Sequence, residues 1–450
     1  MLSRRNFLRT SGLGLAGVMA SQQMLAAVAP SPVPSPAAKK KTTANDKVNL
    51  GFIGLGQQAM NLLNGFIGMD GFRVVCGCDV YDIKRNRFVK RVTDFYTGKG
   101  EKKVKVDVYE DYQDVLARPD VDAVIIAVPD HQHAIIAVAA CKAGKDVYLE
   151  KPMTLTIYEG QVLCKAVRKY GRILQVGSQQ RSSEEFVHAA TMCREGLLGD
   201  ISRVLVFVGR NVNPKSGAPV PNNLKEMPIP EGLNWDKWLG PLNEYVKYNP
   251  DLDPLITETE NEKLWGAWRW YKPTGGGLMT DWGAHMFDIA QWMLGKDGSG
   301  PVEVIPPGYE FTENLTYKYD NGIVMLEQDF GTGQGVRIYG SEGWLEVHRG
   351  SYKTSNPKLE MKKKLNDSDI PFETKAGHYG VFLNSIRTRI DPNVPVETGH
   401  SSCTVCTLGN LAIELNRPLK WNPIVQKFMN DEEASKLMHY KYRDGYTLEL

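Results

Sequence analysis

Three side chains of this sequence have the types and spacing to move a proton. Lys151 follows Glu150 at the end of the apolar run "DVYL", and Asp281 lies four residues before His285 in "TGGGLMTDWGAHMFDIAQWML". On a helix, that spacing places the carboxylate and the imidazole on one face, where they suit the orientation and deprotonation of a sugar hydroxyl group. A desolvated lysine is costly unless it is paired or working, so Lys151 is the expected proton donor and acceptor.

Each of these residues also has an ordinary structural interpretation. Lys151 could cap a strand end at the surface, while Asp281 could begin a helix and His285 could be a satisfied buried histidine. Two ligands without a clear third do not make a zinc site, so we predict no metal. The choice between a structural and a catalytic interpretation therefore depends on which other residues the chain places beside these three.

A glycine turn supplies the second constellation. In "KVNLGFIGLGQQAMNLLNGF" an apolar run leads into Gly54-x-Gly56-x-x-Ala59, which opens an amphipathic pattern. Gly54 would make the tight turn, Gly56 would let a pyrophosphate approach the backbone, and Ala59 would allow close helix–strand packing. Asp79, at the end of the next apolar run, would bind an adenosine ribose and favours NAD. Lys84, Arg85 and Arg87 nearby keep NADP open, and a structural glycine turn without a cofactor is the remaining alternative.

The elements that must position these residues alternate between short apolar runs and helical patterns over residues 47–180. In "VPDHQHAIIAVAACKAGKDVYLEKPMT" one expected strand ends at Val128-Pro129 and the next at Glu150-Lys151. Such alternation predicts a doubly wound parallel sheet, the Rossmann α/β class, with ligands at the carboxyl ends of its strands. Lys151 and the glycine turn should therefore meet at one edge of the sheet.

Beyond residue 180 the pattern changes. Segments such as "ISRVLVFVGR", "LTYKYDNGIVMLEQDF" and "GVRIYGSEGWLEVHR" alternate and carry hairpin-like turns. They predict a second α/β domain, residues 181–420, with an open and mostly antiparallel sheet. An irregular stretch, residues 211–271, holds five tryptophans and is typical of a functional loop or lid. Residues 421–450 are expected to be a C-terminal extension.

The chain begins with a pattern typical of export. Arg4-Arg5 precede a weakly apolar stretch and small residues, which predicts a twin-arginine signal peptide over residues 1–29, followed by a Pro/Ser/Lys-rich linker over residues 30–46. Removing residues 1–29 takes away three arginines and changes the formal charge from +2 to −1, so nothing suggests a nucleic-acid partner. We expect a periplasmic or otherwise exported protein that has no membrane association after cleavage. The seven cysteines lie mostly in apolar runs and are expected to be buried thiols, with the Cys403-Thr404-Val405-Cys406 pair inside a core helix.

Taken in order, "GFIGLGQQA", "VPDHQH", "EKP" and "GGGLMTDWGAHMFD" give the chain a resemblance to the glucose-fructose oxidoreductase, inositol dehydrogenase and MocA (Gfo/Idh/MocA) family over residues 47–420. The resemblance implies an NAD(P)-binding first domain and a second domain whose sheet commonly mediates dimers. The residues that it implies for the cofactor are Gly54, Gly56, Ala59, Asp79, Pro129, His133 and Glu150. It gives Lys151, Asp281 and His285 the catalytic roles. Arg269 and Tyr271 precede the glycines and are candidates for substrate contact, whereas His131 is an addition without an assigned role.

The implied activity is oxidation of a secondary hydroxyl of a sugar, glycoside or cyclitol, with NAD as cofactor, NADP as the alternative, and a dimer or tetramer as the assembly. Because free dinucleotide is scarce outside the cytoplasm, the signal predicts a tightly bound cofactor that is recycled in place. One relative instead cleaves N-acetylgalactosamine by transient oxidation at C3, although "TDWGAHMFD" departs from that branch. A non-catalytic sugar-binding protein is the third alternative.

Overall fold

The computed structural model describes residues 47–210, 217–309, 311–360 and 376–450. The predicted signal peptide and linker lie outside these ranges. No helix in the described part of the chain combines the length and apolar character needed to cross a membrane.

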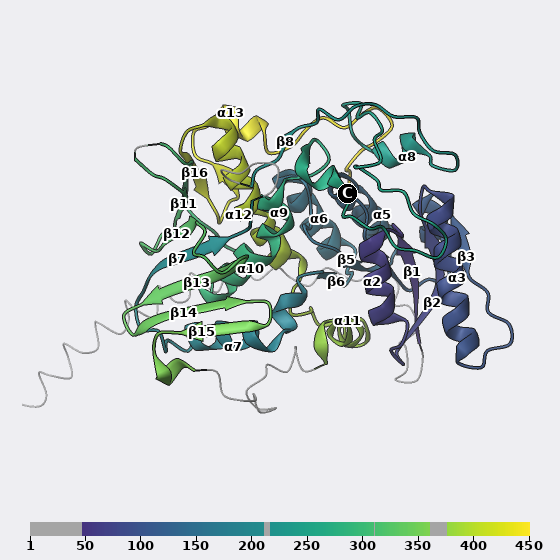
Figure 1. Ribbon diagram of the computed structural model, residues 1–450, viewed down its shortest axis with the longest axis horizontal. Coiled ribbons are helices and arrows are strands. Elements are labelled where there is room, and N and C mark those ends of the chain that lie inside the picture. Colours follow the sequence, from purple (N-terminus) through teal and green to yellow (C-terminus); the bar gives the residue numbers. More distant parts are fainter. Residues whose placement is uncertain (1–46, 211–216, 310, 361–375) are drawn as a thin grey trace, which may run out of the picture. The chain divides into compact units, whose positions relative to one another are not determined.

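The first half is the predicted doubly wound sheet (Figure 1). Six parallel strands lie in the order β3-β2-β1-β4-β5-β6. The strands are β1 (Val48–Ile53), β2 (Phe72–Cys78), β3 (Asp107–Tyr109), β4 (Ala123–Ile126), β5 (Asp146–Leu149) and β6 (Leu174–Val176). The helices between them are α2 (Gln57–Phe66), α3 (Asp82–Gly98), α4 (Tyr112–Ala117), α5 (Asp130–Lys142) and α6 (Ile157–Lys169).

Burial explains the sequence pattern of these elements. Every residue of β4 and β5 is buried, as expected for strands covered on both faces. Almost all of α5 is buried too, which accounts for its apolar character around the whole helix. Gly144 follows α5 with φ +73°, as is common just after a helix. At the start of α6, Thr156 and Glu159 form a capping box that satisfies backbone N–H groups of the first turn.

The second half contains a nine-stranded sheet in the order β15-β14-β13-β7-β12-β11-β10-β16-β17, in which only the β7–β12 pair is parallel. Its strands are β7 (Ile201–Phe207), β10 (Glu303–Ile305), β11 (Leu315–Lys318), β12 (Val324–Glu327), β13 (Gly335–Gly340), β14 (Gly343–His348), β15 (Ser351–Thr354), β16 (Leu419–Asn422) and β17 (Lys427–Phe428). Helices α7 (Glu184–Arg194), α10 (Gly283–Met293) and α12 (Val396–Leu415) share one apolar core with this sheet. The predicted open, mostly antiparallel sheet is confirmed.

The predicted C-terminal boundary is wrong in part. Trp421 and Asn422 end β16, which pairs with β10 through Leu419 and Lys420, and they pair in turn with β17, so the sheet extends beyond residue 420. Helix α11 (Gly377–Thr388) packs on the first half instead, where the Phe382 ring lies 6.3 Å from that of Phe72. The last helix is the short α13 (Glu432–Lys436). The two halves are therefore interleaved along the chain, which single-sequence patterns do not reveal.

The tryptophan-rich segment of the second half runs over the first half (Figure 1). It contains α8 (Trp235–Leu239) and the short strands β8 (Val220–Pro221) and β9 (Tyr271–Lys272), which pair with each other. Asn234 N donates to Val80 O and the Asn234 side chain donates to Glu110, so α8 is fixed to the ends of β2 and β3. This crossing brings second-half residues to the carboxyl edge of the parallel sheet.

The cysteines follow the prediction. Six of the seven thiols are buried and Cys164 is half-buried. Cys403 and Cys406 lie inside α12, where burial raises the pKa of the Cys403 thiol to about 12. A buried neutral thiol is a core residue rather than a nucleophile.

Candidate active site

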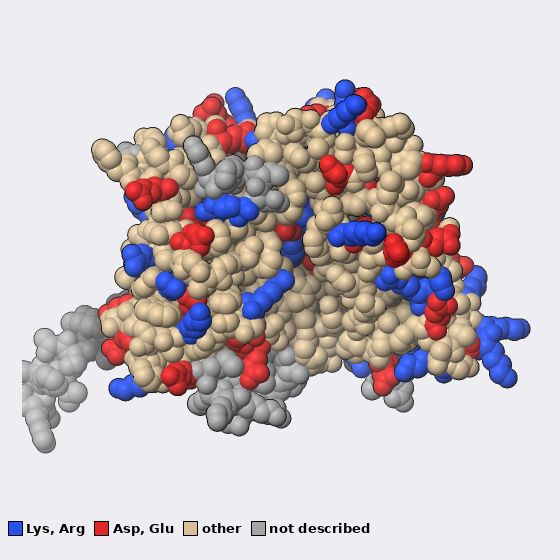
Figure 2. Space-filling model, viewed as in Figure 1, with Lys and Arg blue, Asp and Glu red and all other residues tan. Residues whose placement is uncertain are grey.

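A cavity of about 1280 Å³ lies at the carboxyl edge of the parallel sheet, between that edge and residues of the second half. Nine of the predicted site residues line it: Gly54, Gly56, Asp79, Pro129, Glu150, Lys151, Arg269, Asp281 and His285. On the face shown in Figure 2, charges of both signs are interspersed, and the surface is hollowed near its middle with charged side chains on the walls. The sequence therefore predicted correctly that these residues converge.

The two glycines of the turn have different roles. Gly54 has φ +80°, and a Cβ there would lie 2.5 Å from the carbonyl oxygen of Ala127. Gly56 is the residue before α2, and a Cβ there would have only Glu262 Oε1, at 3.8 Å, within 4 Å. Ala59 is fully buried between helix and sheet rather than in the cavity wall. Gly54 is thus required by the fold, whereas Gly56 keeps the cavity open beside the positive end of a helix.

This difference gives a first testable prediction. Gly54→Ala is expected to lower the melting temperature, because the new methyl group meets backbone and φ is unfavourable. Gly56→Ala is expected to melt like the parent but to bind NAD about tenfold or more weakly, because its methyl occupies the space of the pyrophosphate. Thermal melts and calorimetric titration with NAD separate the two effects. Parent-like NAD affinity in Gly56→Ala would contradict the assignment of the turn.

Asp79 is held ready to accept hydrogen bonds from a ligand. Leu55 N donates to its Oδ2 at 2.7 Å and Tyr81 N donates to its Oδ1 at 2.9 Å. These two backbone groups fix the carboxylate between the phosphate turn and the start of α3. A carboxylate in this place suits the hydroxyls of an adenosine ribose.

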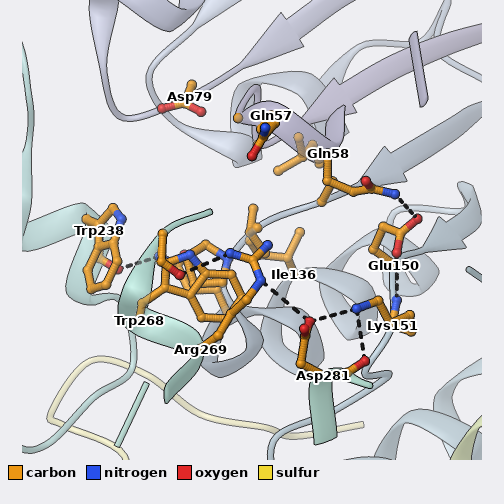
Figure 3. A pocket seen from close by; sticks show the side chains of 18 of the residues that line it. Gln57, Gln58, Asp79, Ile136, Glu150, Lys151, Trp238, Trp268, Arg269 and Asp281 are labelled. Carbon is orange, nitrogen blue, oxygen red and sulfur yellow. Dashed lines mark hydrogen bonds and ion pairs between the residues drawn. The ribbon is translucent and has the colours of Figure 1, made fainter. Parts of the chain in front are cut away.

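Lys151 and Asp281 form an ion pair inside the cavity. Lys151 Nζ donates to Asp281 Oδ1 at 2.7 Å and to the Asp281 carbonyl oxygen at 3.1 Å, and Arg269 Nε lies 3.5 Å from the same Oδ1. Figure 3 shows Lys151 and Arg269 directed at the Asp281 carboxylate from two sides. Burial would raise the pKa of Asp281, but Lys151 and Arg269 hold it below its usual value. Asp281 therefore stays ionised and fixes the lysine.

Glu150 accepts hydrogen bonds from the backbone of Lys151 and from two glutamine side chains. Its Oε1 accepts a hydrogen bond from Gln58 at 2.9 Å, and its Oε2 accepts one from Lys151 N at 3.1 Å (Figure 3). Oε1 also accepts a hydrogen bond from Gln179 at 2.7 Å. Burial raises the pKa of this carboxyl group. Glu150 thus links α2, the end of β5 and the residues after β6.

His285 is a buried neutral imidazole. Burial, followed by the charges of Lys151 and Arg349, keeps its pKa well below 6.5. Its Nδ1 has no hydrogen-bond partner within the described ranges. The predicted single helix is divided at Trp282 into α9 (Leu278–Asp281) and α10, although Met286 N still donates to Trp282 O. Asp281 and His285 therefore reach the cavity from consecutive helices.

Two predicted contacts lie elsewhere. His133 is fully enclosed, with Nδ1 2.7 Å from Pro152 O and Nε2 2.9 Å from Val128 O, so it joins the ends of two strands and does not line the cavity. Tyr271 packs against the apolar cluster around Trp238 and is also outside the cavity wall. His131 is likewise buried, with Nε2 3.0 Å from Trp238 O. The motif spacing predicted that these residues lie near the site, but it did not predict the direction of their side chains.

The tryptophans divide between core and cavity. Trp235 stacks on Trp238 at 4.2 Å inside the apolar cluster, whereas Trp238, Trp265, Trp268 and Trp270 line the cavity. The guanidinium of Arg269 lies over the Trp268 ring at 4.2 Å. Loop packing is therefore confirmed for Trp235, whereas stacking of the cavity tryptophans on a sugar stays a prediction.

Sequence reasoning missed several cavity residues of the second half. Arg349, in the turn after β14, lies 4.6 Å above the Trp282 ring, and Arg210 pairs with Glu327 at 2.7 Å. Asp253 and Glu262 also line the cavity. None belongs to a spaced motif, so only the strand order and loop path bring them here. Among the described residues no group of three potential ligands could hold a metal ion.

Some known proteins are similar to this chain in sequence. Curated relatives include a "Glycosyl hydrolase family 109 protein" of Shewanella baltica, 30% identical over 210 residues. Another is the alpha-N-acetylgalactosaminidase of Shewanella oneidensis, 28% identical over 210 residues. In both comparisons the match spans 44% of this chain and 44% of the relative.

Solved structures share the fold over most of the chain. The WlbA dehydrogenase of Bordetella pertussis, in complex with NADH and UDP-GlcNAcA, has a TM-score of 0.57 at 18% identity, covering 84% of this chain and 99% of that one. The aldose-aldose oxidoreductase of Caulobacter crescentus, complexed with glycerol, has a TM-score of 0.54 at 18% identity, with 83% and 99% covered.

Family profiles match both halves. Residues 48–178 match the NAD-binding Rossmann fold of an oxidoreductase family, and residues 187–448 match its C-terminal alpha/beta domain. The matched ranges contain the phosphate turn, Lys151, Asp281 and His285. The chain therefore belongs to the Gfo/Idh/MocA oxidoreductase family, and its first half is that family's NAD-binding domain.

Proposed function

We propose that this protein is an exported NAD-dependent oxidoreductase that oxidises a secondary hydroxyl group of a sugar, glycoside or cyclitol. The observation that carries the proposal is the cavity at the carboxyl edge of the sheet. It joins the phosphate turn and Asp79 to the Lys151–Asp281 pair and His285. Aromatic and cationic side chains of the second half line the same cavity, and such side chains suit the binding of a carbohydrate.

The residues present fit a dinucleotide. Gly56 leaves space at the start of α2, and Asp79 is oriented by two backbone N–H groups. Gln57 Oε1, in the first turn of α2, is buried without a hydrogen-bond partner within the described ranges. Bound NAD would supply the hydride acceptor. The protein's own groups supply proton transfer, orientation and charge stabilisation.

The proton chemistry follows from the charges of the three polar groups. Burial keeps the pKa of His285 well below 6.5, so its imidazole is unprotonated at neutral pH and has a ring nitrogen that can receive the hydroxyl proton. The Lys151 ammonium can donate a hydrogen bond to the alkoxide that develops as the proton leaves. Asp281 holds that ammonium in place, and Arg269 holds Asp281. The site thus divides proton acceptance and charge stabilisation between two side chains.

Product analysis tests the proposed reaction. Native protein is incubated with a panel of monosaccharides, glycosides and cyclitols, and the products are analysed by mass spectrometry. The expected product is the substrate with two hydrogens removed, as a ketone. A panel returned unchanged by cofactor-loaded protein would support the non-catalytic sugar-binding alternative instead.

The glycosidase names of two curated relatives favour a second candidate. Such an enzyme would oxidise the sugar transiently and then eliminate the glycosidic substituent. The same proton-moving residues would serve it, since oxidation of one carbon makes the neighbouring C–H acidic. The two candidates differ in their products. The oxidoreductase leaves an oxidised but intact glycoside, whereas the glycosidase releases the substituent and returns a sugar at its original oxidation level.

Export by the twin-arginine route and assembly as a dimer or tetramer belong to the same proposal. Arg4 and Arg5 support export because paired arginines before an apolar stretch mark this route. The route carries folded proteins, so the protein can bind its cofactor before it is exported. Replacing both arginines by lysine is expected to leave the protein in the cytoplasmic fraction, as measured by fractionation and immunoblotting. Parent-like distribution of that variant would contradict twin-arginine export.

Sedimentation analysis of the purified protein measures the assembly, and the expected result is the mass of a dimer or tetramer.

A further inference from the structure

The basic residues beside Asp79 are all engaged by other groups. Lys84 Nζ lies 2.5 Å from Asp253 Oδ1 and 3.9 Å from Glu262 Oε1. Arg87 pairs with Glu262 at 2.9 Å, and Arg85 donates to the carbonyl oxygen of Asp79 at 2.5 Å. The cations that keep NADP open in the sequence are therefore held within the protein.

The partners of Lys84 and Arg87 come from the second half of the chain. Asp253 and Glu262 belong to the segment that crosses the first half (Figure 1), and they reach helix α3 from about 170 residues away in sequence. The side chains of the Lys84–Asp253 pair are only 7% and 9% exposed. Lys84, Asp253 and Glu262 all line the cavity that contains Asp79. The pair thus lies beside the place proposed for the adenosine ribose.

Several contacts fix this segment along α2 and α3. Asn86 donates to Glu258 at 3.1 Å, Arg91 donates to the Asn261 side chain at 2.7 Å, and Gln57 donates to Glu262 O at 3.2 Å. Arg87 also donates to Leu55 O at 2.6 Å, which ties the segment to the phosphate turn. The position of Asp253 is therefore set by a series of polar contacts and does not depend on one ion pair.

The charges around the ribose position disfavour a phosphate. A basic side chain near the acidic residue is what accommodates the 2′-phosphate of NADP in Rossmann domains. Here Lys84 is neutralised by Asp253, and Asp79 adds a further negative charge. Asp253 Oδ2 is buried and has no hydrogen-bond partner in the described part of the chain, so the described side-chain contact that holds this carboxylate is the one with Lys84. Arg85, the remaining cation, lies outside the cavity wall. A 2′-phosphate would therefore meet the Asp79 carboxylate beside a lysine that is already paired, whereas ribose hydroxyls would meet Asp79 as an acceptor.

We propose that Asp253 is a coenzyme-selecting residue: by holding Lys84, this carboxylate from the second half denies the lysine to the 2′-phosphate of NADP and makes the site specific for NAD. The inference rests on the proposed function, because it names the coenzyme of the same site. It adds a specificity determinant outside the dinucleotide-binding half. Selection then depends on contact between the two halves.

The test measures coenzyme binding and needs no substrate. Dissociation constants for NAD and NADP are measured by calorimetry on the full-length protein after its bound nucleotide is removed. The variants are Asp253→Asn, Asp253→Asn with Lys84→Met, and Asp251→Asn as the control, since Asp251 is an exposed acid of the same segment outside the cavity wall. Melting curves accompany every variant.

The parent and Asp251→Asn are expected to prefer NAD equally. Asp253→Asn should shift the ratio of the two dissociation constants toward NADP by about tenfold or more, because the freed lysine can pair with the phosphate. Adding Lys84→Met should abolish that gain. A folded Asp253→Asn protein with an unchanged ratio, or a gain that persists without Lys84, would overturn the proposal.

The double variant keeps the proposal testable if Asp253→Asn does not fold, because it removes both buried charges together. Its NADP affinity should equal that of the parent, in which Lys84 is already neutralised. A loss of about tenfold would mean that Lys84 contacts the phosphate in the parent and would overturn the inference. A parent that prefers NADP overturns the inference alone, whereas a parent that binds neither coenzyme overturns the proposed function with it.

Discussion

Replacing Lys151 by methionine is expected to reduce the turnover number by about a thousandfold or more while leaving NAD affinity close to that of the parent. The ammonium of Lys151 is held by Asp281 Oδ1 at 2.7 Å in the cavity wall, where it can stabilise a developing alkoxide. Methionine retains most of the side-chain volume and removes the charge. Steady-state kinetics on the identified substrate and calorimetry with NAD give the two quantities.

Lys272→Met is the matched control for this variant. Lys272 also precedes a proline, pairs with Glu414 at 2.6 Å and lies outside the cavity wall. Its turnover number should match that of the parent. If Lys151→Met retained a turnover number within threefold of that control, about 0.7 kcal/mol or less of barrier, the catalytic assignment of Lys151 would be wrong.

His285→Asn is expected to lower kcat/KM by about a hundredfold or more, because it removes the proton acceptor while keeping a polar side chain of similar size. The pH dependence carries further information. Burial and the charges of Lys151 and Arg349 depress the pKa of His285, so protonation of the base begins only well below pH 6.5. Accordingly, kcat/KM of the parent should stay level as the pH falls from neutral to 6.5 and should decline only at lower pH.

The control for this variant is His348→Asn, at a histidine of β14 that does not line the cavity. Its pH profile should overlay that of the parent. An acid limb centred near pH 6.5 in the parent would show that the proton acceptor has an ordinary imidazole pKa. That outcome would contradict the role given to buried His285.

Local sequence patterns predicted the parallel sheet because each element carries its own signal. The apolar runs of β4 and β5 are buried on both faces, and Gly144 ends α5 where the helical pattern stops. Lys151 was predictable for a similar reason. It follows a strand directly, and parallel strands bring their carboxyl ends to one edge.

The remaining features depend on contacts between distant parts of the chain. His133 has the spacing of a cavity residue, but its two nitrogens face the carbonyl oxygens of Val128 and Pro152. Asp253 and Glu262 reach α3 only because a long segment crosses the first half. Strands β16 and β17 join the sheet through pairing of β16 with β10, which no local turn signals. A periodic pattern specifies an element but not its neighbour.

The most direct measurement of the central claim uses the native protein without added cofactor. The purified protein is mixed with a panel of sugars, glycosides and cyclitols, and the absorbance band of reduced nicotinamide is followed during the first turnover. The account predicts that at least one substrate class raises this band in the parent, and that Lys151→Met, carrying the same amount of bound NAD, shows no rise. NAD-loaded parent protein whose band stays unchanged with every compound, with neither oxidised nor cleaved product, would contradict the account.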